Sequence, residues 1–392
     1  MATDEISQQT DDGESSTKLE KTLSVSIEES RIRDAYERRD IEELRSIAIQ
    51  PGGFISDDLR RKAWPILLGF EPDDSTSDRA GGAWKELPHH RDEEQVKLDV
   101  DRSFVYYPND NSEAQLDAKK SELLDLITEV LREQPYLCYF QGYHDICQVL
   151  LLVLPPASRA RAVSRLSVLR IRDFMLPTLS PAIAHLRLIP DLLRAADPKL
   201  CAHLSRNEPY FALSDTLTMF AHNVQRYSDI ARLFDALIAS EQVFSIYVFT
   251  QIVVRRRDEL LAHDEPDMLH FFLSKLPPDL DLDAVIADAA QLLKTYPPDS
   301  LRAWRGILGA SVLKTTRDPK ALAGQSLLDG RAFFERQAAE LVWAERREKV
   351  LHVAYTNRAL LLTILVGVGA VYLRKTLVAP GMMAWAMKWW RS

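Results

Sequence analysis

Apolar residues recur at helical spacing along most of this chain, and this spacing constrains the fold more than any other feature. In the stretch 119–133, Leu123, Ile127 and Val130 fall on one face of a helix among charged residues. Alternation of apolar and polar residues with a period of two, which is typical of strands, is nearly absent. We therefore predict an all-α fold.

Proline, glycine and capping residues divide the chain into separate helices. Pro51-Gly52-Gly53 interrupts the first helical pattern, and Ser56 is a predicted N-cap for the helix that follows and ends at Gly69. The apolar run 243–254 is about 12 residues long, shorter than the roughly 20 that a bilayer requires, so we expect a buried core helix there. Helices are predicted over residues 29–47, 59–68, 119–133, 146–154, 171–186, 189–196, 215–223, 230–239, 243–254, 269–276, 284–296 and 333–353.

The overall composition limits the classes of partner and the compartment. The chain has 392 residues, 46% of them hydrophobic, which is enough for one large core or two ordinary ones. A formal net charge of -8 argues against nucleic-acid binding, which depends on neutralising phosphates. The three cysteines show no CxxC spacing, which favours a reducing, cytosolic environment. Residues 1–29 are rich in Ser, Thr, Asp and Glu and are expected to form a disordered acidic tail without a signal peptide.

The C-terminal part differs in composition from the rest. We expect a charged helical linker over 317–354, a single transmembrane anchor over 355–373 and a short basic and aromatic tail over 374–392. The apolar run 359–373 alone would reach about 22 Å, and extending it to Tyr355 gives about 28 Å, close to the roughly 27 Å of a thin bilayer. The expectation is a tail-anchored protein with its globular part in the cytosol.

Common catalytic signatures are missing from the sequence. It contains no GxxxxGKS/T phosphate loop, no HExxH zinc helix and no GxSxG nucleophile elbow. Cys138, His144, Asp145 and Cys147 lie close together in sequence, but their spacing is not that of a regular metal site, so no metal is expected. An α-helical hydrolase with its own substrate therefore has no nucleophile and base to support it.

Two polar residues, Arg102 and Gln141, remain as candidates for chemistry. Arg102 follows Asp99 and Asp101, and by itself it would be interpreted as a structural residue in a salt bridge. Gln141 precedes Gly142 and by itself would be interpreted as a helix cap or a buried amide with satisfied hydrogen bonds. The residues around both decide between these readings and a functional one.

Together, the surrounding motifs resemble those of the TBC family, the GTPase-activating proteins of Rab-type small GTPases. A tryptophan motif is present as Arg61-Lys62-Ala63-Trp64, and an IxxDxxR motif is present with Val96 in place of the isoleucine, followed by Asp99 and Arg102. A YxQG motif follows as Tyr139-Phe140-Gln141-Gly142. The three motifs occur in the family's order, and the resemblance extends over about residues 31–315. It implies a multi-helix TBC domain, which we assign to residues 30–316.

The resemblance implies a role for each motif residue. Arg102 would be an arginine finger that stabilises negative charge on the transferred phosphoryl group, and Gln141 a glutamine finger that positions the attacking water. Gly142 would allow close backbone approach to the nucleotide. Supporting roles are expected for Asp99, Tyr139, Gly142, Asp145, Arg61 and Trp64. The partner would be a Rab in its GTP form, and GTP and Mg²⁺ would be bound by that partner, so no cofactor of the chain itself is expected.

Within the family, a TBC domain followed by a C-terminal anchor resembles the member of the endoplasmic reticulum membrane that acts in ER-to-Golgi transport. We therefore expect an activator of Rab GTP hydrolysis on that membrane, and not an enzyme with a substrate of its own. The alternative is a membrane-tethered helical adaptor that binds a Rab without activating it. The presence of both Arg102 and Gln141 favours the activator.

Overall fold

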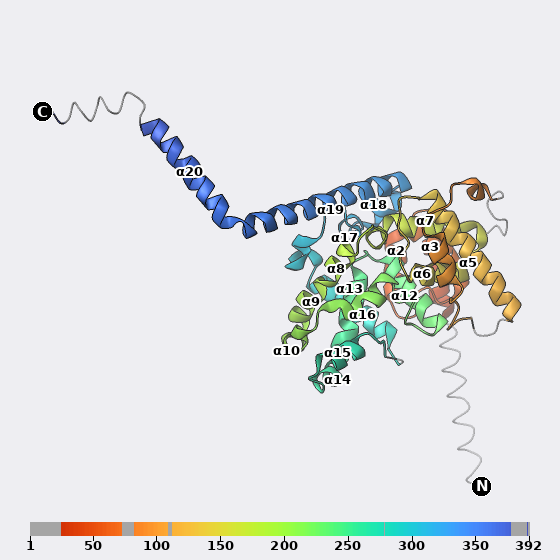
Figure 1. The fold of residues 1–392 in the computed structure, drawn as a ribbon. Coiled ribbons are helices and arrows are strands. Elements are labelled where there is room, and N and C mark those ends of the chain that lie inside the picture. The colour runs from red at the N-terminus through yellow and green to blue at the C-terminus, as the bar shows by residue number, and fades with distance from the viewer. Residues whose placement is uncertain (1–24, 73–81, 109–111, 278, 378–389, 391–392) are drawn as a thin grey trace, which may run out of the picture. The chain divides into compact units, whose positions relative to one another are not determined.

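The computed structural model describes residues 25–72, 82–108, 112–277, 279–377 and 390. Every regular element in these ranges is helical, which confirms the predicted all-α class (Figure 1). A helix already begins at residue 25, inside the stretch 1–29 that was expected to be disordered, while residues 1–24 lie outside the described part. The chain divides into two compact units, Met1–Gln337 and Ala338–Ser392.

The first unit holds almost all of the helices. After the helix over residues 25–37, its elements are α2 (Ile41–Ile49), α3 (Asp57–Leu67), η1 (Ala83–Glu86), α4 (Glu93–Val100), α5 (Glu113–Glu133), α6 (Tyr143–Val153), α7 (Pro156–Leu169), η2 (Arg172–Phe174), α8 (Ser180–Leu186), α9 (Leu188–Ala196), α10 (Pro198–His203), η3 (Leu204–Arg206), η4 (Pro209–Ala212), α11 (Leu213–Leu217), α12 (Tyr227–Ala239), α13 (Phe244–Arg255), α14 (Arg257–Leu261), α15 (Pro266–Leu273), α16 (Leu282–Thr295), η5 (Pro298–Ser300), η6 (Ala303–Gly306), α17 (Val312–Thr315) and α18 (Pro319–Gly324). The helix α19 (Leu327–Thr356) begins in this unit, where Phe334 and Gln337 are buried. Residues 317–337, expected in the linker, thus lie within the first unit.

Local sequence signals explain several helix ends. Ser56 is the N-cap of α3, as predicted, although its side chain makes no capping hydrogen bond. The helix stops at Gly69, whose φ of 83° lies in the left-handed region. At the start of α5, Ser112 and Gln115 form a reciprocal capping box, which places the beginning of that helix before the predicted residue 119.

Several helix predictions differ from the structure. The helices α4, α10 and α14 were not predicted, and the helix predicted over 215–223 is only α11, which ends at Leu217 and is followed by turns. The helix α7 was not predicted, because its buried face includes Arg165, whose guanidinium donates hydrogen bonds to the backbone carbonyls of Leu68 and Ala323. A buried charged side chain that binds backbone carbonyls interrupts an apolar pattern without interrupting the helix. The single helix predicted over 171–186 is instead η2 and α8, because Pro181 sets the first turn of α8.

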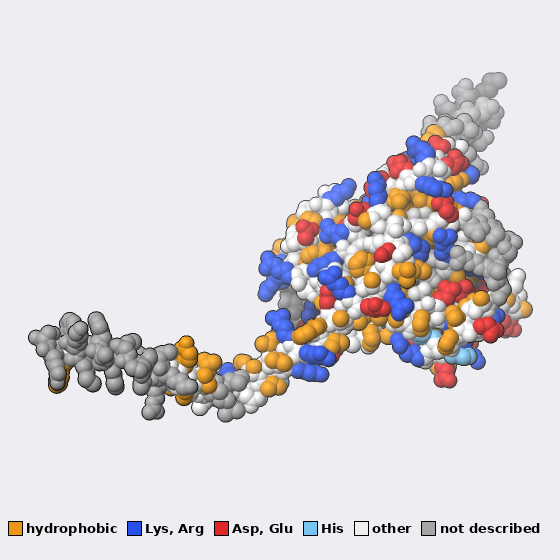
Figure 2. All heavy atoms as spheres, turned by 90° about the horizontal axis from the view of Figure 1, so that it is seen from above, with side chains coloured by type: hydrophobic (Ala, Val, Ile, Leu, Met, Phe, Trp, Pro, Cys, Tyr) orange, Lys and Arg blue, Asp and Glu red, His pale blue; other side chains and the backbone are white. Residues whose placement is uncertain are grey.

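The core of the first unit lies around α13, which packs against α9 and α16. All residues from Phe244 to Val253 are buried, which confirms that the run 243–254 is a core helix. The neighbouring helix α12 packs against α2 and α3. On the face shown in Figure 2, Lys and Arg side chains are mixed with Asp and Glu, as the composition leads one to expect.

A buried carboxylate, Asp235 on α12, holds α3 in place. It accepts hydrogen bonds from Trp64 Nε1 at 2.8 Å, from Arg60 Nε at 3.0 Å and from the backbone N–H of Phe54 at 3.1 Å. Burial raises the pKa of Asp235, and the Arg60 guanidinium opposes that rise. Trp64 therefore has a structural role. The ionic partner of Asp235 in this network is Arg60. Arg61, the neighbour named from the sequence, instead donates to the Val153 carbonyl at 3.0 Å.

The second unit contains the end of α19 and the helix α20 (Arg358–Leu377). Within the part of the chain that is described, no helix is both long and apolar enough to cross a membrane. The transmembrane helix predicted over 355–373 is therefore not supported. Only the 15 residues 359–373 separate Arg358 from Arg374, which corresponds to about 22 Å of helix, whereas a bilayer core is about 30 Å thick. Most of the expected tail 374–392 lies outside the described residues.

Candidate functional site

A cleft of about 620 Å³ in the first unit brings the two candidate residues Arg102 and Gln141 together. They are 39 positions apart in sequence (141 minus 102), and they reach the cleft from the end of α4 and from the turn before α6. The opposite side is formed by α11 and the residues that follow it. The lining residues are Asp99, Arg102, Ser103, Phe104, Val105, Tyr106, Tyr107, Phe140, Gln141, Gly142, His144, Asp145, Gln148, Leu179, Leu213, Ser214, Leu217, Thr218, Ala221 and His222.

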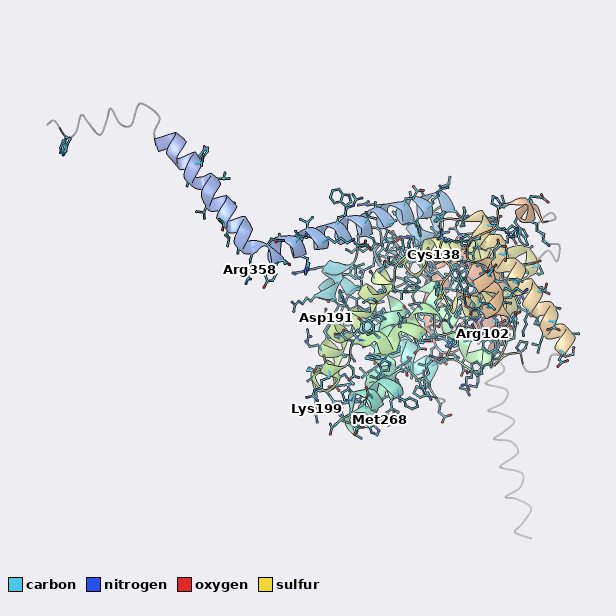
Figure 3. All side chains as sticks on the ribbon, in the orientation of Figure 1. Arg102, Cys138, Asp191, Lys199, Met268 and Arg358 are labelled. Atoms are coloured by element: carbon cyan, nitrogen blue, oxygen red, sulfur yellow. The ribbon has the colours of Figure 1, made fainter. Side chains whose placement is uncertain are left out.

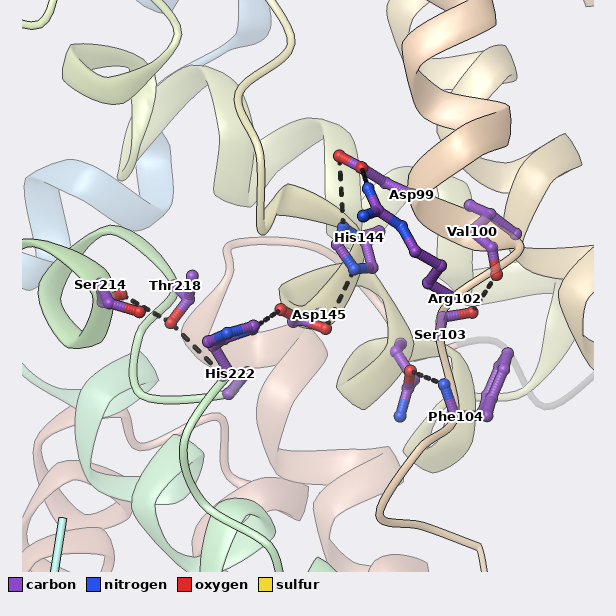
Figure 4. A network of polar contacts seen from close by, with 12 residues as sticks. Asp99, Val100, Arg102, Ser103, Phe104, His144, Asp145, Ser214, Thr218 and His222 are labelled. Atoms are coloured by element: carbon purple, nitrogen blue, oxygen red, sulfur yellow. Dashed lines mark hydrogen bonds and ion pairs between the residues drawn. The ribbon is translucent and has the colours of Figure 1, made fainter. Parts of the chain in front are cut away.

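The side chain of Arg102 is fixed at one end and open to solvent at the other. Its Nη2 forms an ion pair of 2.6 Å with Asp99 Oδ1 (Figure 4). Its Nε donates to the Leu98 carbonyl at 3.2 Å. Asp99 lies three residues earlier on α4, so the pair follows from helical spacing. The Arg102 side chain is still 67% exposed, which leaves guanidinium N–H groups available to a partner.

Asp99 connects the two sequence motifs. Its side chain is 1% exposed, and its Oδ2 accepts a hydrogen bond of 2.8 Å from the hydroxyl of Tyr139. Burial, together with this bond to Asp99, raises the pKa of the Tyr139 phenol, so the hydroxyl remains a donor. A residue of the YxQG motif thereby fixes the carboxylate that holds Arg102.

Gln141 is exposed and lies in the turn that leads into α6. The next residue, Gly142, caps this helix with a φ of 97°, a conformation that L side chains rarely adopt. A Cβ at this position would lie 2.5 Å from Thr218 Cγ2. Glycine is therefore required for two reasons that lie within the chain itself, the backbone conformation and the close approach of Thr218.

A chain of polar contacts continues from Tyr139 across the cleft. The Tyr139 hydroxyl lies 3.1 Å from His144 Nδ1, and His144 Nε2 lies 3.2 Å from Asp145 Oδ1. Asp145 Oδ2 is 2.9 Å from His222 Nδ1, and Figure 4 shows this contact reaching from α6 to the segment after α11. Burial lowers the pKa of His144, against the carboxylates of Asp145 and Asp99, while the hydrogen bond to Asp145 raises the pKa of His222.

Sequence reasoning assigned no role to His222, and it considered His144 only as a possible metal ligand. The only sequence signal for His144 is its position directly after the YxQG motif. His222 is 77 residues from Asp145, its partner, and has no motif around it that would have revealed the contact.

The rim of the cleft beside Arg102 is apolar and exposed. Val105 is 73% exposed, and Tyr106 and Leu179 are about half exposed. The preceding residue, Phe104, has a φ of 61°, and its backbone N–H donates to Gln148 Oε1 at 3.0 Å. The buried side-chain amide of Gln148 holds the strained backbone of Phe104, which precedes the exposed rim residues Val105 and Tyr106. Exposed apolar side chains that lie together beside polar groups are a feature of protein interaction surfaces.

The two cysteines that were considered as metal ligands, Cys138 and Cys147, have different surroundings. Cys138 Sγ accepts from Arg91 Nη2 at 2.9 Å, and Cys147 is fully buried in α6 (Figure 3 labels Cys138 and Arg102). Burial raises the pKa of both thiols, which favours the protonated form that binds metals poorly. Among the residues that are described, no group of three or more His, Cys, Asp or Glu side chains is placed to hold a metal ion.

The cleft therefore offers an exposed guanidinium and an exposed amide among its lining residues. A guanidinium stabilises negative charge on phosphoryl oxygens, and an amide both accepts from and donates to water. Such a pair suits chemistry on a phosphate group that another macromolecule brings to the cleft.

Comparisons with known proteins identify the family of the chain. Residues 57–261 match the model of the Rab-GTPase-TBC domain. The chain is 33% identical over 326 residues to the GTPase-activating protein gyp10 of Schizosaccharomyces pombe, covering 80% of this chain and 84% of that protein. It is 32% identical to TBC1 domain family member 20 of Bos taurus, covering 90% of this chain and 88% of the relative. The crystal structure of the Ypt/Rab-GAP domain of Gyp1p superposes with a TM-score of 0.47 at 15% identity, over 66% of this chain and 94% of that one. The chain belongs to the Rab-GTPase-TBC domain family.

Proposed function

We propose that this protein is a GTPase-activating protein for a Rab-family GTPase. The observation that carries the proposal is the placement of Arg102 and Gln141 at one exposed cleft, on a chain of the Rab-GTPase-TBC family. In the proposed mechanism, the Rab in its GTP form docks on the cleft and carries the nucleotide and Mg²⁺. The chain contributes side chains and binds no nucleotide of its own.

Each of the two residues has a separate task in this mechanism. Arg102 places its guanidinium against the oxygens of the γ-phosphate, where negative charge is stabilised as the bond to the leaving group breaks. Gln141 orients the attacking water in line with that bond, as the GTPase's own glutamine does in other systems. Asp99 positions Arg102, and Tyr139 positions Asp99.

The test is single-turnover GTP hydrolysis by a panel of purified GTP-loaded Rabs, with the full chain added. Stimulation is expected for at least one Rab, and Arg102→Ala is expected to lower the stimulated rate by a factor on the order of 10³ to 10⁵. Arg102→Lys is expected to recover little of it, because an ammonium cannot reproduce the planar fork. Gln141→Ala should also lose most of the stimulation.

Arg206→Ala is the matched control, because Arg206 is an exposed arginine outside the cleft. Gln141→Ala and Arg206→Ala are expected to keep the wild-type unfolding midpoint, since exposed side chains contribute little to stability. The two Arg102 variants alter the ion pair of buried Asp99, so urea unfolding is measured first to establish that they are folded under the assay conditions. A Rab that binds the chain but is stimulated equally by wild type and Arg102→Ala would refute the two-finger mechanism. Binding without any stimulation would support the adaptor instead.

We further propose a Rab of ER-to-Golgi transport as the substrate, on the resemblance described from the sequence. The Rab panel tests this directly through the ratio of stimulated rates. A preference for Rabs of another transport step would overturn it without affecting the two-finger mechanism.

A further inference from the structure

A second cavity, of about 640 Å³, lies on the first unit and shares no lining residue with the cleft. It is formed by the helix over residues 25–37, the first half of α3 and the junction between α6 and α7. Four of its lining side chains are cations, namely Arg33, Arg61, Lys62 and Arg159. A single carboxylate, Asp58, accompanies them.

The charge of this basic cavity is opposite to that of the chain. Two carboxylates, Asp58 and Glu122, form ion pairs with Arg61 and Arg159, so the four cations and these two carboxylates carry a formal charge of +2 (4 minus 2), whereas the chain as a whole carries -8. The first turn of the 14-residue helix α7, at Pro155 and Pro156, also faces the cavity. The positive end of the helix dipole adds to the field of the side chains. An anionic ligand is therefore attracted to this cavity.

Two of the arginines are held in place by backbone carbonyls of consecutive residues. Arg61 Nε donates to the carbonyl of Val153 at 3.0 Å, and Arg159 Nε donates to the carbonyl of Leu154 at 2.9 Å. Their Nη1 atoms form ion pairs with Asp58 at 2.7 Å and with Glu122 at 2.8 Å. The Nη2 groups take no part in these bonds. Each guanidinium is thus oriented by the protein and retains N–H groups for a ligand.

We infer that the basic cavity binds a ligand with clustered phosphate groups. A planar guanidinium binds phosphate in a bidentate manner, so two oriented arginines together with Arg33 and Lys62 favour phosphates over a single carboxylate. The volume lies within the range of ordinary ligand pockets and exceeds what one inorganic phosphate would fill. The same phosphate chemistry occurs in soluble inositol phosphates and in phosphoinositide headgroups. This inference does not depend on the proposed GTPase activation.

The experiment measures binding of the full chain to inositol 1,4,5-trisphosphate by calorimetry, and to vesicles by co-sedimentation. The vesicles contain phosphatidylcholine with either phosphatidylinositol 4,5-bisphosphate or, at equal charge, phosphatidylserine. The test variant is Arg33→Gln with Lys62→Gln. The matched control is Arg206→Gln with Lys294→Gln, which removes the same charge from exposed positions that do not line the cavity.

We expect the test variant to weaken binding at least about tenfold and the control variant to bind like wild type. Binding of the soluble trisphosphate without vesicle binding identifies a free ligand. Vesicle binding that prefers the bisphosphate lipid over phosphatidylserine and is competed by the trisphosphate identifies a headgroup.

Four results would overturn the inference. The first three are no binding of either probe, equal binding by the test and control variants, and measurable but equal binding of the two anionic vesicles. Binding of an acidic peptide in place of both phosphate probes would overturn it as well. Stimulated GTP hydrolysis in solution is expected to be the same for wild type and the test variant, so failure of the activity proposal would leave the binding result unaffected.

Discussion

A buried carboxylate beside the cleft predicts how the stability of the domain depends on pH. Asp215 on α11 is fully buried; its Oδ1 accepts from Asn223 Nδ2 at 2.8 Å, and its Oδ2 has no partner in the described part of the chain. Burial raises the pKa of Asp215 from its ordinary value of 3.8 to about 7, although Asn223 and His222 oppose the rise. We expect Asp215→Asn, which is nearly isosteric, to remove this titration.

The sign of the effect follows from the raised pKa. A carboxyl that is more basic in the folded state stabilises the fold fully below pH about 4, and this contribution is lost as the pH rises toward 7. The pKa rises by about 3, and a change of one in pKa corresponds to about 1.36 kcal/mol. The effect on the free energy of unfolding is therefore at most roughly 4 kcal/mol. Asp215→Asn is therefore expected to be more stable than wild type by up to roughly 4 kcal/mol at pH 8 and nearly equal to it at pH 4.

Urea unfolding of wild type and Asp215→Asn at pH values from 4 to 8 measures this difference, in which the titration of all other groups largely cancels. Asp117→Asn serves as a control for the substitution itself, since Asp117 is exposed. A difference for Asp215→Asn that changes by less than about 0.5 kcal/mol over this range would refute the reasoning.

Three further predictions concern the contacts that build the domain and the cleft. Trp64→Phe removes the 2.8 Å bond to buried Asp235 and is expected to cost about 1 to 3 kcal/mol in urea unfolding, and an unchanged midpoint would contradict the proposed anchor. Gly142→Ala is expected to destabilise by more than about 1 kcal/mol, and Thr218→Ser in the same chain should recover only the steric part, because the positive φ remains. Asp99→Asn is expected to lower the maximal stimulated rate of Rab GTP hydrolysis roughly tenfold, and a loss confined to KM would argue against a positioning role.

Much of the fold could be predicted from the sequence because most helices bury an apolar face. The run 243–254 and the stretch 119–133 show this plainly, and both lie in helices. The failures arise where polar groups are buried. Arg165 on α7 binds backbone carbonyls, and a pattern that counts charged residues as exposed misses that helix. Arg60 lies on the correctly predicted helix α3, but the pattern does not show that it is buried against Asp235. Those partners are distant in sequence and are defined only by the tertiary fold.

The C-terminal prediction failed for another reason. A sequence window shows that residues 359–373 lack charged side chains, but it does not show where a helix begins and ends. The helix α20 includes Arg358 and also Arg374 and Lys375. Extending the apolar run to Tyr355 gave a length near the lower limit for a membrane span. At that length, a few charged residues determine whether a helix is apolar enough to span a bilayer.

The candidate site was only partly accessible from the sequence. The ion pair of Asp99 with Arg102 joins residues three positions apart, Asp99 in α4 and Arg102 in the turn after it, but no helix was predicted over 93–100. The contact of Asp145 with His222 joins residues 77 positions apart and requires the tertiary structure. The role expected for Gly142 was close approach to a nucleotide, whereas the structure shows that its own backbone conformation and Thr218 already require glycine. A glycine at this position is therefore weak support for catalysis.

The link between the two motifs gives a physical reason for their occurrence together. Arg102 is presented by α4 and Gln141 by the start of α6, and α5 separates these elements in sequence while packing against both. Helix packing alone would position the backbones, but a flexible arginine also needs a fixed partner, which Asp99 provides. Asp99 in turn is buried, and while Arg102 and Gln95 donate to its Oδ1, its Oδ2 accepts from Tyr139 of the other motif. Loss of Tyr139 would therefore affect Arg102 through Asp99, although none of these interactions joins Tyr139 directly to Arg102.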